Sequence, residues 1–258
     1  MCGRLFLLMF LAGLAGCSSF NSALPAPERA KPDSSALSMD AGDLSRVHPL
    51  EKLKPHVKQL GESVPQETKD HTYLFFINGL DPYYLANFRG QCQYMKTLGY
   101  NNAYCGQMSH ADLFGKMIKK VRKDDPQAQL VVIGYSSGAN SARTLANQLK
   151  DEGVPIDLLV YLGGDMIQDG ERSRPQNVGR ILNICGHGMI LLGYDLFVCG
   201  DEIKGASNHR IDARHFLLPT RAEAVELLVR YVVDLNQAPL PQRDDAPVSR
   251  TSWNMRGK

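Results

Sequence analysis

Short apolar runs that alternate with segments of helical periodicity constrain the fold of this chain more than any other feature. Apolar residues recur at helical spacing around 84–98, over 109–123 and after the glycine at 138. Buried strands that alternate with helices form a mostly parallel sheet covered by helices on both faces. We therefore expect an α/β fold, with strands at TYLFFIN (72–78), YNNAYCG (100–106), QLVVIG (129–134), IDLLVYLGG (156–164) and GRILNICG (179–186).

Two polar pairs mark expected helix starts. Ser109 and Asp112 are placed to cap a helix that runs to Lys123, and Thr220 and Glu223 form a capping-box pattern. The second pattern precedes apolar residues that share one helical face: Val225, Leu228, Val229 and Val232. The segment between Gly164 and Asn177 is short, so we expect a compact domain without a large cap over the sheet edge.

The N-terminus has the pattern of an export signal. Arg4 precedes the apolar run LFLLMFLAGLA, which is too short to cross a membrane and is typical of a secretory signal. Leu14, Ala15, Gly16 and Cys17 resemble the lipobox of bacterial lipoproteins. That resemblance implies cleavage after residue 16 and acylation of Cys17, by chains such as palmitate. The protein would then be anchored by lipid in the bacterial cell envelope, at the periplasmic face or in the outer membrane.

Composition divides the rest of the chain. Residues 17–69 are rich in Ser, Ala, Pro and charge and predict a tether, with a short helix possible within 46–69. Residues 70–236 are long enough for one domain, and 237–258 are expected to be a flexible tail. The formal net charge of +2 gives no electrostatic case for nucleic-acid binding. The oligomeric state is not indicated by the sequence.

The pentapeptide GYSSG (134–138) lies between the strand QLVVI and a helical pattern. A serine hydroxyl needs a neighbouring base and an exposed position to act as a nucleophile. A sharp strand–turn–helix provides the exposure, and glycines two residues before and after let strand and helix pass closely. We therefore predict that Ser136 is a nucleophile and that the backbone N–H of Ser137 helps to bind an oxyanion. The alternatives are Ser137 as the nucleophile, although Ser136 occupies the centre of the motif, and a glycine-rich turn without chemistry.

The loop after the first strand is a candidate for the second half of an oxyanion site. The sequence FFINGLDPYY continues the strand into Asn78, Gly79 and Leu80. Over residues 70–236 the chain resembles the α/β-hydrolase family of lipases, esterases and cutinases, in which this place holds the oxyanion loop. The resemblance implies the N–H of Leu80 as the second donor. Asn78 stands where many members have histidine, and a plain turn is the alternative.

His215 is the leading candidate for the catalytic base. It lies in ARHFLLPT, just before the last predicted helix, and this stretch resembles the histidine loop of lipase-like and thioesterase-like hydrolases. His209 and His187 are the alternatives among the histidines beyond Ser136. A surface or structural histidine is the simpler interpretation of each.

The acid that would orient the base is the most open position. Most α/β-hydrolases place it after the strand that corresponds to RILNIC, but GHGMILLG follows here without a carboxylate. Asp165 is the preferred candidate, because it closes the stretch YLGGD directly after the preceding strand. Asp195 lies between two cysteines and resembles the acid of cutinases, and Asp201 is the third candidate. The order Ser136, Asp165, His215 agrees with the chain order expected for this fold.

Cys92, Cys105, Cys185 and Cys199 lie within the domain. Because an exported protein meets an oxidising compartment, we expect local disulfides between Cys92 and Cys105 and between Cys185 and Cys199. A bridge over a short loop contributes about 3 kcal/mol in the chain-entropy model. Metal binding is disfavoured, since there is no C-x-x-C motif and no nearby histidine pair.

These features predict a serine hydrolase acting on a small carboxylic ester or a lipid ester, with no cofactor and no metal implied. The alternative is a catalytically silent hydrolase fold that serves as an envelope binding or scaffolding lipoprotein, which the missing carboxylate after RILNIC favours. Acyl transfer to an acceptor other than water, or thioester cleavage, would use the same residues.

Overall fold

The computed structural model describes residues 55–81, 86–164, 175–187, 189–191, 194–196 and 202–237. The chain divides into two units, 1–41 and 42–258, and all described residues belong to the second. The predicted export signal, Cys17 and the C-terminal tail beyond residue 237 lie outside the described residues.

A parallel six-stranded sheet with the order β2-β1-β3-β4-β5-β8 forms the centre of the domain. The five predicted strands are all present, and the predicted α/β class with a parallel sheet is confirmed. A short antiparallel hairpin, β6 (Met189–Leu191) and β7 (Tyr194–Leu196), follows β5. The sheet strands are β1 (Thr72–Asn78), β2 (Ala103–Gln107), β3 (Gln129–Tyr135), β4 (Ile156–Leu162), β5 (Val178–His187) and β8 (Ser207–Arg214).

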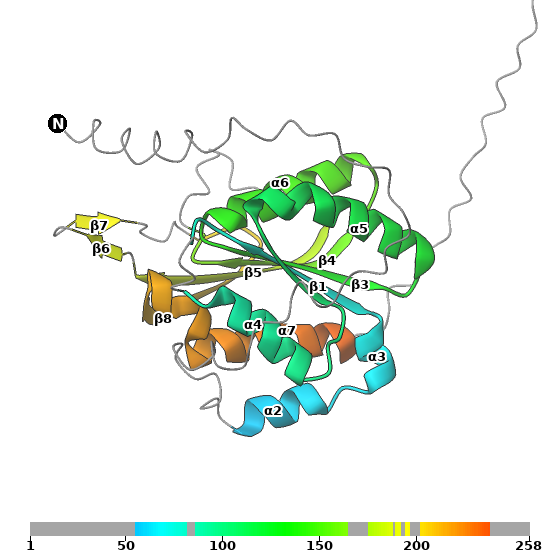
Figure 1. The fold of residues 1–258 in the computed structure, drawn as a ribbon, viewed down its shortest axis with the longest axis horizontal. Helices are drawn as coiled ribbons and strands as arrows, with labels where there is room; N and C mark the ends of the chain where they lie inside the picture. The colour runs from blue at the N-terminus through cyan, green and yellow to red at the C-terminus, as the bar shows by residue number, and fades with distance from the viewer. Residues whose placement is uncertain are drawn as a thin grey trace, which may run out of the picture. The chain divides into compact units, whose positions relative to one another are not determined.

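Helices cover both faces of the sheet, as Figure 1 shows. The α5 (Ala111–Asp124) and α6 (Ser137–Asp151) helices lie on one face. The α2 (Pro55–Glu62), α4 (Phe88–Thr97) and α7 (Ala222–Gln237) helices lie on the other. Shorter helical segments connect these layers: α3 (Gln66–Asp70), η4 (Met108–His110) and η5 (His215–Thr220).

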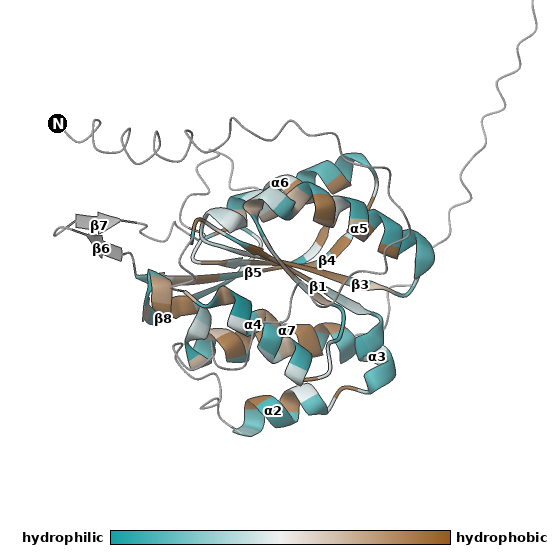
Figure 2. Cartoon of the chain, viewed as in Figure 1, coloured by the Kyte–Doolittle hydropathy of each residue, from teal (hydrophilic) through white to brown (hydrophobic). Residues whose placement is uncertain are grey.

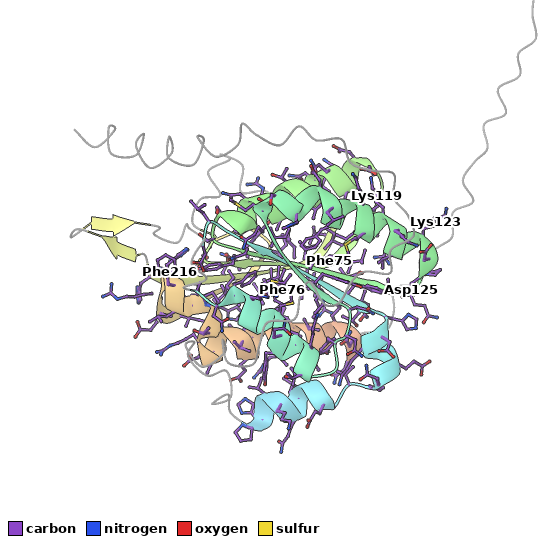
Figure 3. All side chains as sticks on the ribbon, in the orientation of Figure 1. Phe75, Phe76, Lys119, Lys123, Asp125 and Phe216 are labelled. Carbon is purple, nitrogen blue, oxygen red and sulfur yellow. The ribbon has the colours of Figure 1, made fainter. Side chains whose placement is uncertain are left out.

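The core consists of two apolar layers, one on each face of the sheet. Neighbouring residues of a strand point to opposite faces, so Phe75 packs with α5 and α6 while Phe76 packs with α4 and α7. Both rings are fully buried near the middle of the sheet (Figure 3). Apolar colour is concentrated on the strands and the inward sides of the helices (Figure 2). Fully burying one such side chain contributes about 1.5–3 kcal/mol.

The N-terminal limit of the folded domain differs from the prediction. The helix expected within 46–69 is present as α2, but it is not part of a tether. Val57 of α2 and Val64 are both buried in the same apolar layer as α7. The apolar core therefore extends to the N-terminal side of residue 70, because these two valines belong to one of its layers.

Both predicted helix caps are wrong in detail. The α5 helix begins at Ala111, and Gln107 and His110 form the capping box of the preceding turn η4, which includes Ser109. The Thr220 hydroxyl donates to the carbonyl of Leu217 at 3.2 Å, within η5. In both places a short 3₁₀ turn precedes the helix, and Ser109 and Thr220 belong to these turns instead of capping the helices.

Within the described ranges, no helix has both the length and the apolar character that a membrane crossing requires.

Candidate active site

Ser136 occupies a strained turn between β3 and α6. Its backbone has φ 54° and ψ −131°, and Asn87 is the other non-glycine residue with positive φ in the described ranges. A residue held in such a region costs about 1–3 kcal/mol and persists only where its surroundings enforce it. The Ser136 N–H donates to the carbonyl of Leu162 at the end of β4, at 2.9 Å. This geometry is that of a nucleophile elbow.

The two glycines of GYSSG allow backbone segments to pass at close range. A Cβ on Gly134 would lie 2.5 Å from the carbonyl oxygen of Gly138 and 2.6 Å from the Cα of Ala139. A Cβ on Gly138 would collide with the carbonyl oxygen of Ile77 and lie 2.8 Å from the carbonyl carbon of Asn78. The first residues of α6 therefore lie directly against the backbone of β3 and β1.

His215 is the histidine that reaches Ser136. Its Nε2 lies 2.9 Å from the Ser136 Oγ, and the two side chains come from segments 79 residues apart. Ser136 is 8% exposed and His215 is 3% exposed. The other two candidates lie elsewhere, since His187 pairs with Asp212 at 2.9 Å and His209 approaches the Tyr231 hydroxyl at 3.5 Å.

Tyr135 holds the His215 ring from the side of the elbow. Its hydroxyl donates to the carbonyl oxygen of His215 at 3.0 Å. The two rings stack with centroids 5.1 Å apart and planes 27° apart. Phe88 of α4 stacks on Tyr135 in turn, at 5.4 Å. This support could not be predicted from the sequence, because Tyr135 fills the variable position of the motif.

Burial keeps the His215 imidazole neutral. Loss of solvent lowers the pKa of His215 to about 4, and the nearby Asp81 carboxylate opposes that shift. A neutral imidazole can accept a proton from a hydroxyl at hydrogen-bond distance. The position and the protonation state of His215 therefore both suit a general base.

The loop after β1 meets the start of α6. The backbone N–H of Leu80 donates to the Ser137 Oγ at 3.0 Å. Asp81 anchors the other side of the loop, since its carboxylate accepts from the Ala86 N–H at 2.9 Å while 3% exposed. Asp81 was not singled out from the sequence, although it lies in the stretch NGLDP.

Asp165, Asp201 and the side chain of Asp195 lie outside the described residues. Gly163 does lie beside the base: a Cβ on Gly163 would be 3.3 Å from the Nδ1 of His215. The end of β4 therefore runs past the ring nitrogen that faces away from Ser136.

The predicted bridge between Cys92 and Cys105 is wrong, since both are free thiols in the structure. Cys92 of α4 and Cys105 of β2 hydrogen-bond to each other instead. That hydrogen bond, with burial, raises the pKa of Cys92, and the same bond lowers the pKa of Cys105. Cys185 is disulfide-bonded, and Cys199, its predicted partner, lies outside the described residues.

The described residues contain no group of three His, Cys, Asp or Glu side chains arranged to hold a metal ion.

Comparison with known proteins gives neighbours among solved structures alone. No protein-family model and no curated protein matches the chain. The chain is similar to a predicted CIB-like hydrolase from Thermoplasma acidophilum, with 14% identity and a TM-score of 0.39 over 64% of this chain and 87% of that one. It is also similar to the Trichoderma reesei cutinase in complex with a C11Y4 phosphonate inhibitor, with 15% identity and a TM-score of 0.34 over 76% and 96%. Both TM-scores are below 0.5, so the assignment of function depends on the geometry of the site.

Proposed function

We propose that the protein is a serine hydrolase that cleaves carboxylic esters, including lipid esters, through an acyl-serine intermediate. One observation carries the proposal. The Ser136 Oγ lies on a strained turn between strand and helix, 2.9 Å from the Nε2 of a buried histidine. A hydroxyl is a weak nucleophile without such a base, and the strain has a use only if this hydroxyl must be presented.

The reaction begins with attack of the Ser136 Oγ on the ester carbonyl carbon. The hydroxyl proton passes to the Nε2 of His215, and the carbonyl π electrons move to oxygen, which becomes the oxyanion. Collapse of this intermediate breaks the bond to the alcohol, which leaves with the proton from Nε2. Water then attacks the acyl-serine by the same steps, and releases the carboxylic acid and free Ser136.

The start of α6 supports the negative charge of the intermediate. The Ser137 N–H belongs to the first turn of the helix, where backbone donors have no partner within the helix and the helix dipole favours an anion. Removing one oxyanion donor typically costs about 10²–10³ in turnover.

Asp165 is the acid that we propose to orient the His215 ring. The support is the path of β4, because Gly163 lies beside the Nδ1 of His215 and Asp165 follows two residues later. A carboxylate at Nδ1 fixes the tautomer that leaves Nε2 free to accept a proton.

Asp165→Asn is therefore expected to keep the fold and lower kcat by about 10⁴, the loss known for this change in the serine-protease triad. Asp195→Asn and Asp201→Asn are the matched controls and should have mild effects on kcat. A large loss in either control with an active Asp165→Asn would assign the acid to the segment after β5 instead.

Ser136→Ala tests the proposed function. This variant should abolish both the hydrolysis of a p-nitrophenyl ester and covalent labelling by a fluorophosphonate probe, because both need the hydroxyl. Ser141→Ala, in the same helix, is the matched control and should retain both activities. Unchanged labelling of Ser136→Ala would refute the assignment. Absence of labelling in the unmodified protein would favour a silent, binding role for the fold.

A further inference from the structure

The Ser137 hydroxyl, on the residue after the proposed nucleophile, already accepts a hydrogen bond. Its oxygen accepts the Leu80 N–H at 3.0 Å, across the contact between the β1 loop and the elbow. The side chain is half-buried beside Ser136. A hydroxyl carries one proton as well as two lone pairs. Within the described residues the Ser137 hydroxyl donates to no partner, so its proton is available to a ligand.

The loop that supplies the Leu80 N–H is fixed close to the elbow. A Cβ on Gly79 would lie 2.9 Å from the Ser137 nitrogen, 2.9 Å from the Ser136 Cβ and 2.7 Å from the Tyr135 carbonyl oxygen. The Asp81 N–H donates to the carbonyl of Gly79 at 3.0 Å, which tightens the turn. The Leu80 N–H therefore has a defined direction, toward the Ser137 Oγ.

We infer that the Ser137 hydroxyl is the second oxyanion donor, and that the Leu80 N–H acts through it. This inference rests on the proposed function. The chain of hydrogen bonds would run from the Leu80 N–H to the Ser137 Oγ, and from the Ser137 O–H to the oxyanion. The Ser137 N–H is the other donor to the same oxygen. No proton is transferred along this chain, and no covalent bond of Ser137 changes.

The arrangement requires no hydrogen bond to break when the reaction starts. Oxyanion sites are effective because their donors are oriented before the charge develops. A Leu80 N–H that bound the oxyanion directly would first have to leave the Ser137 Oγ. A hydroxyl that accepts one hydrogen bond becomes a stronger donor in the next, because hydrogen bonds in a chain polarise one another. The contact as it stands therefore strengthens the Ser137 hydroxyl as a donor.

Ser137→Ala tests this role. The variant should hydrolyse a p-nitrophenyl ester with kcat lowered by about 10²–10³, the loss typical of one oxyanion donor, while KM changes little. Binding of a trifluoromethyl ketone, which forms a hemiketal oxyanion on Ser136, should weaken by a similar factor. Loss of a residue that merely supported the fold would not weaken binding of the oxyanion inhibitor while leaving KM for the ester unchanged. Ser141→Ala is the control and should match the unmodified protein in all three measurements.

Ser137→Cys provides a second measurement if Ser137→Ala does not fold. The thiol is similar in size to the hydroxyl and is a weaker donor, so this variant should also lose turnover and inhibitor affinity.

Turnover of Ser137→Ala equal to or above that of the unmodified protein would overturn the inference. The Leu80 N–H would then bind the oxyanion directly, with the hydroxyl as an obstacle. That result is distinct from failure of the proposed function, because Ser136→Ala would still be inactive and unlabelled. Ester hydrolysis that survives Ser136→Ala would refute both.

Discussion

Three consecutive residues connect the parts of the proposed site. Tyr135 stacks on the His215 ring and donates to its carbonyl, Ser136 contacts the Nε2 of the same ring, and the Ser137 hydroxyl accepts from the Leu80 N–H. A displacement of the elbow would therefore change the position of the base and the oxyanion donors together. For this reason the turn must be rigid, and the close backbone contacts of its glycines provide that rigidity.

The pH dependence of hydrolysis should report the buried state of His215. Burial lowers the pKa of His215 to about 4, so the neutral, proton-accepting form persists well below the ordinary pKa of histidine. We expect the acid limb of kcat/KM to have its midpoint near pH 4, measured with an uncharged ester between pH 3.5 and 8. A midpoint near 6.5 would contradict this environment.

The same shift destabilises the fold in acid. The unfolded chain takes up a proton near the ordinary pKa of about 6.5, whereas the folded chain does so near 4. The free energy of unfolding should therefore fall by roughly 3 kcal/mol on this account as the pH drops from 7 to 4. Chemical denaturation at each pH measures this loss of stability separately from the loss of activity in acid.

Asp81→Asn, which removes the carboxylate that raises the pKa of His215, is expected to move the acid limb of kcat/KM to lower pH.

The sequence reveals residues whose role depends on their neighbours in the chain, but not those whose role depends on distant contacts. Ser136 and Ser137 follow from a strand–turn–helix pattern within one short stretch. His215 could be ranked above His187 and His209 through its resemblance to a histidine loop, and the structure brings it to Ser136. Tyr135 stacks on His215, and the Asp81 carboxylate raises the pKa of His215. Both effects join residues far apart in the chain, so no local sequence pattern predicts them.

At the scale of elements, the strands with continuous apolar runs were predictable, whereas the edge strand β8 was not. The β3 and β4 strands are buried on both faces, so nearly every residue is apolar. The β8 strand, SNHRIDAR, buries Ile211 and Ala213 alone, because it pairs with β5 on one side and forms the edge of the sheet. Its polar composition hides it from a search for apolar runs.

Helix starts were harder to predict than helices. The sequence places helices near α4, α5, α6 and α7 because their apolar residues recur on one face. The starts of α5 and α7 differ because η4 and η5 precede them. In η5 this turn has a functional consequence, since His215 is its first residue and the turn directs the ring back toward the elbow.

At the scale of the whole molecule, we propose that acyl chains on Cys17 hold the protein in the bacterial cell envelope. The proposal rests on the lipobox-like residues 14–17 after the apolar run. Cys17→Ser should release the protein from the membrane fraction and leave its thermal unfolding unchanged, because the apolar layers described for the domain are built from residues beyond 54. Fractionation followed by blotting would show the shift. A variant that still sediments with membranes would indicate attachment through another segment or a partner.

The polar edge strand β8 has a consequence for when the protein gains activity. Leu80, Ser136 and His215 follow β1, β3 and β8, so the last strand of the sheet brings the base to the nucleophile. On the proposed function, a newly made chain would hydrolyse esters only after β8 has joined β5, however much of the earlier sheet has formed. Edge elements with few buried side chains are also among the first to open locally. Transient opening of β8 would then switch hydrolysis off while the rest of the domain stays folded, so loss of activity should precede unfolding on gentle heating.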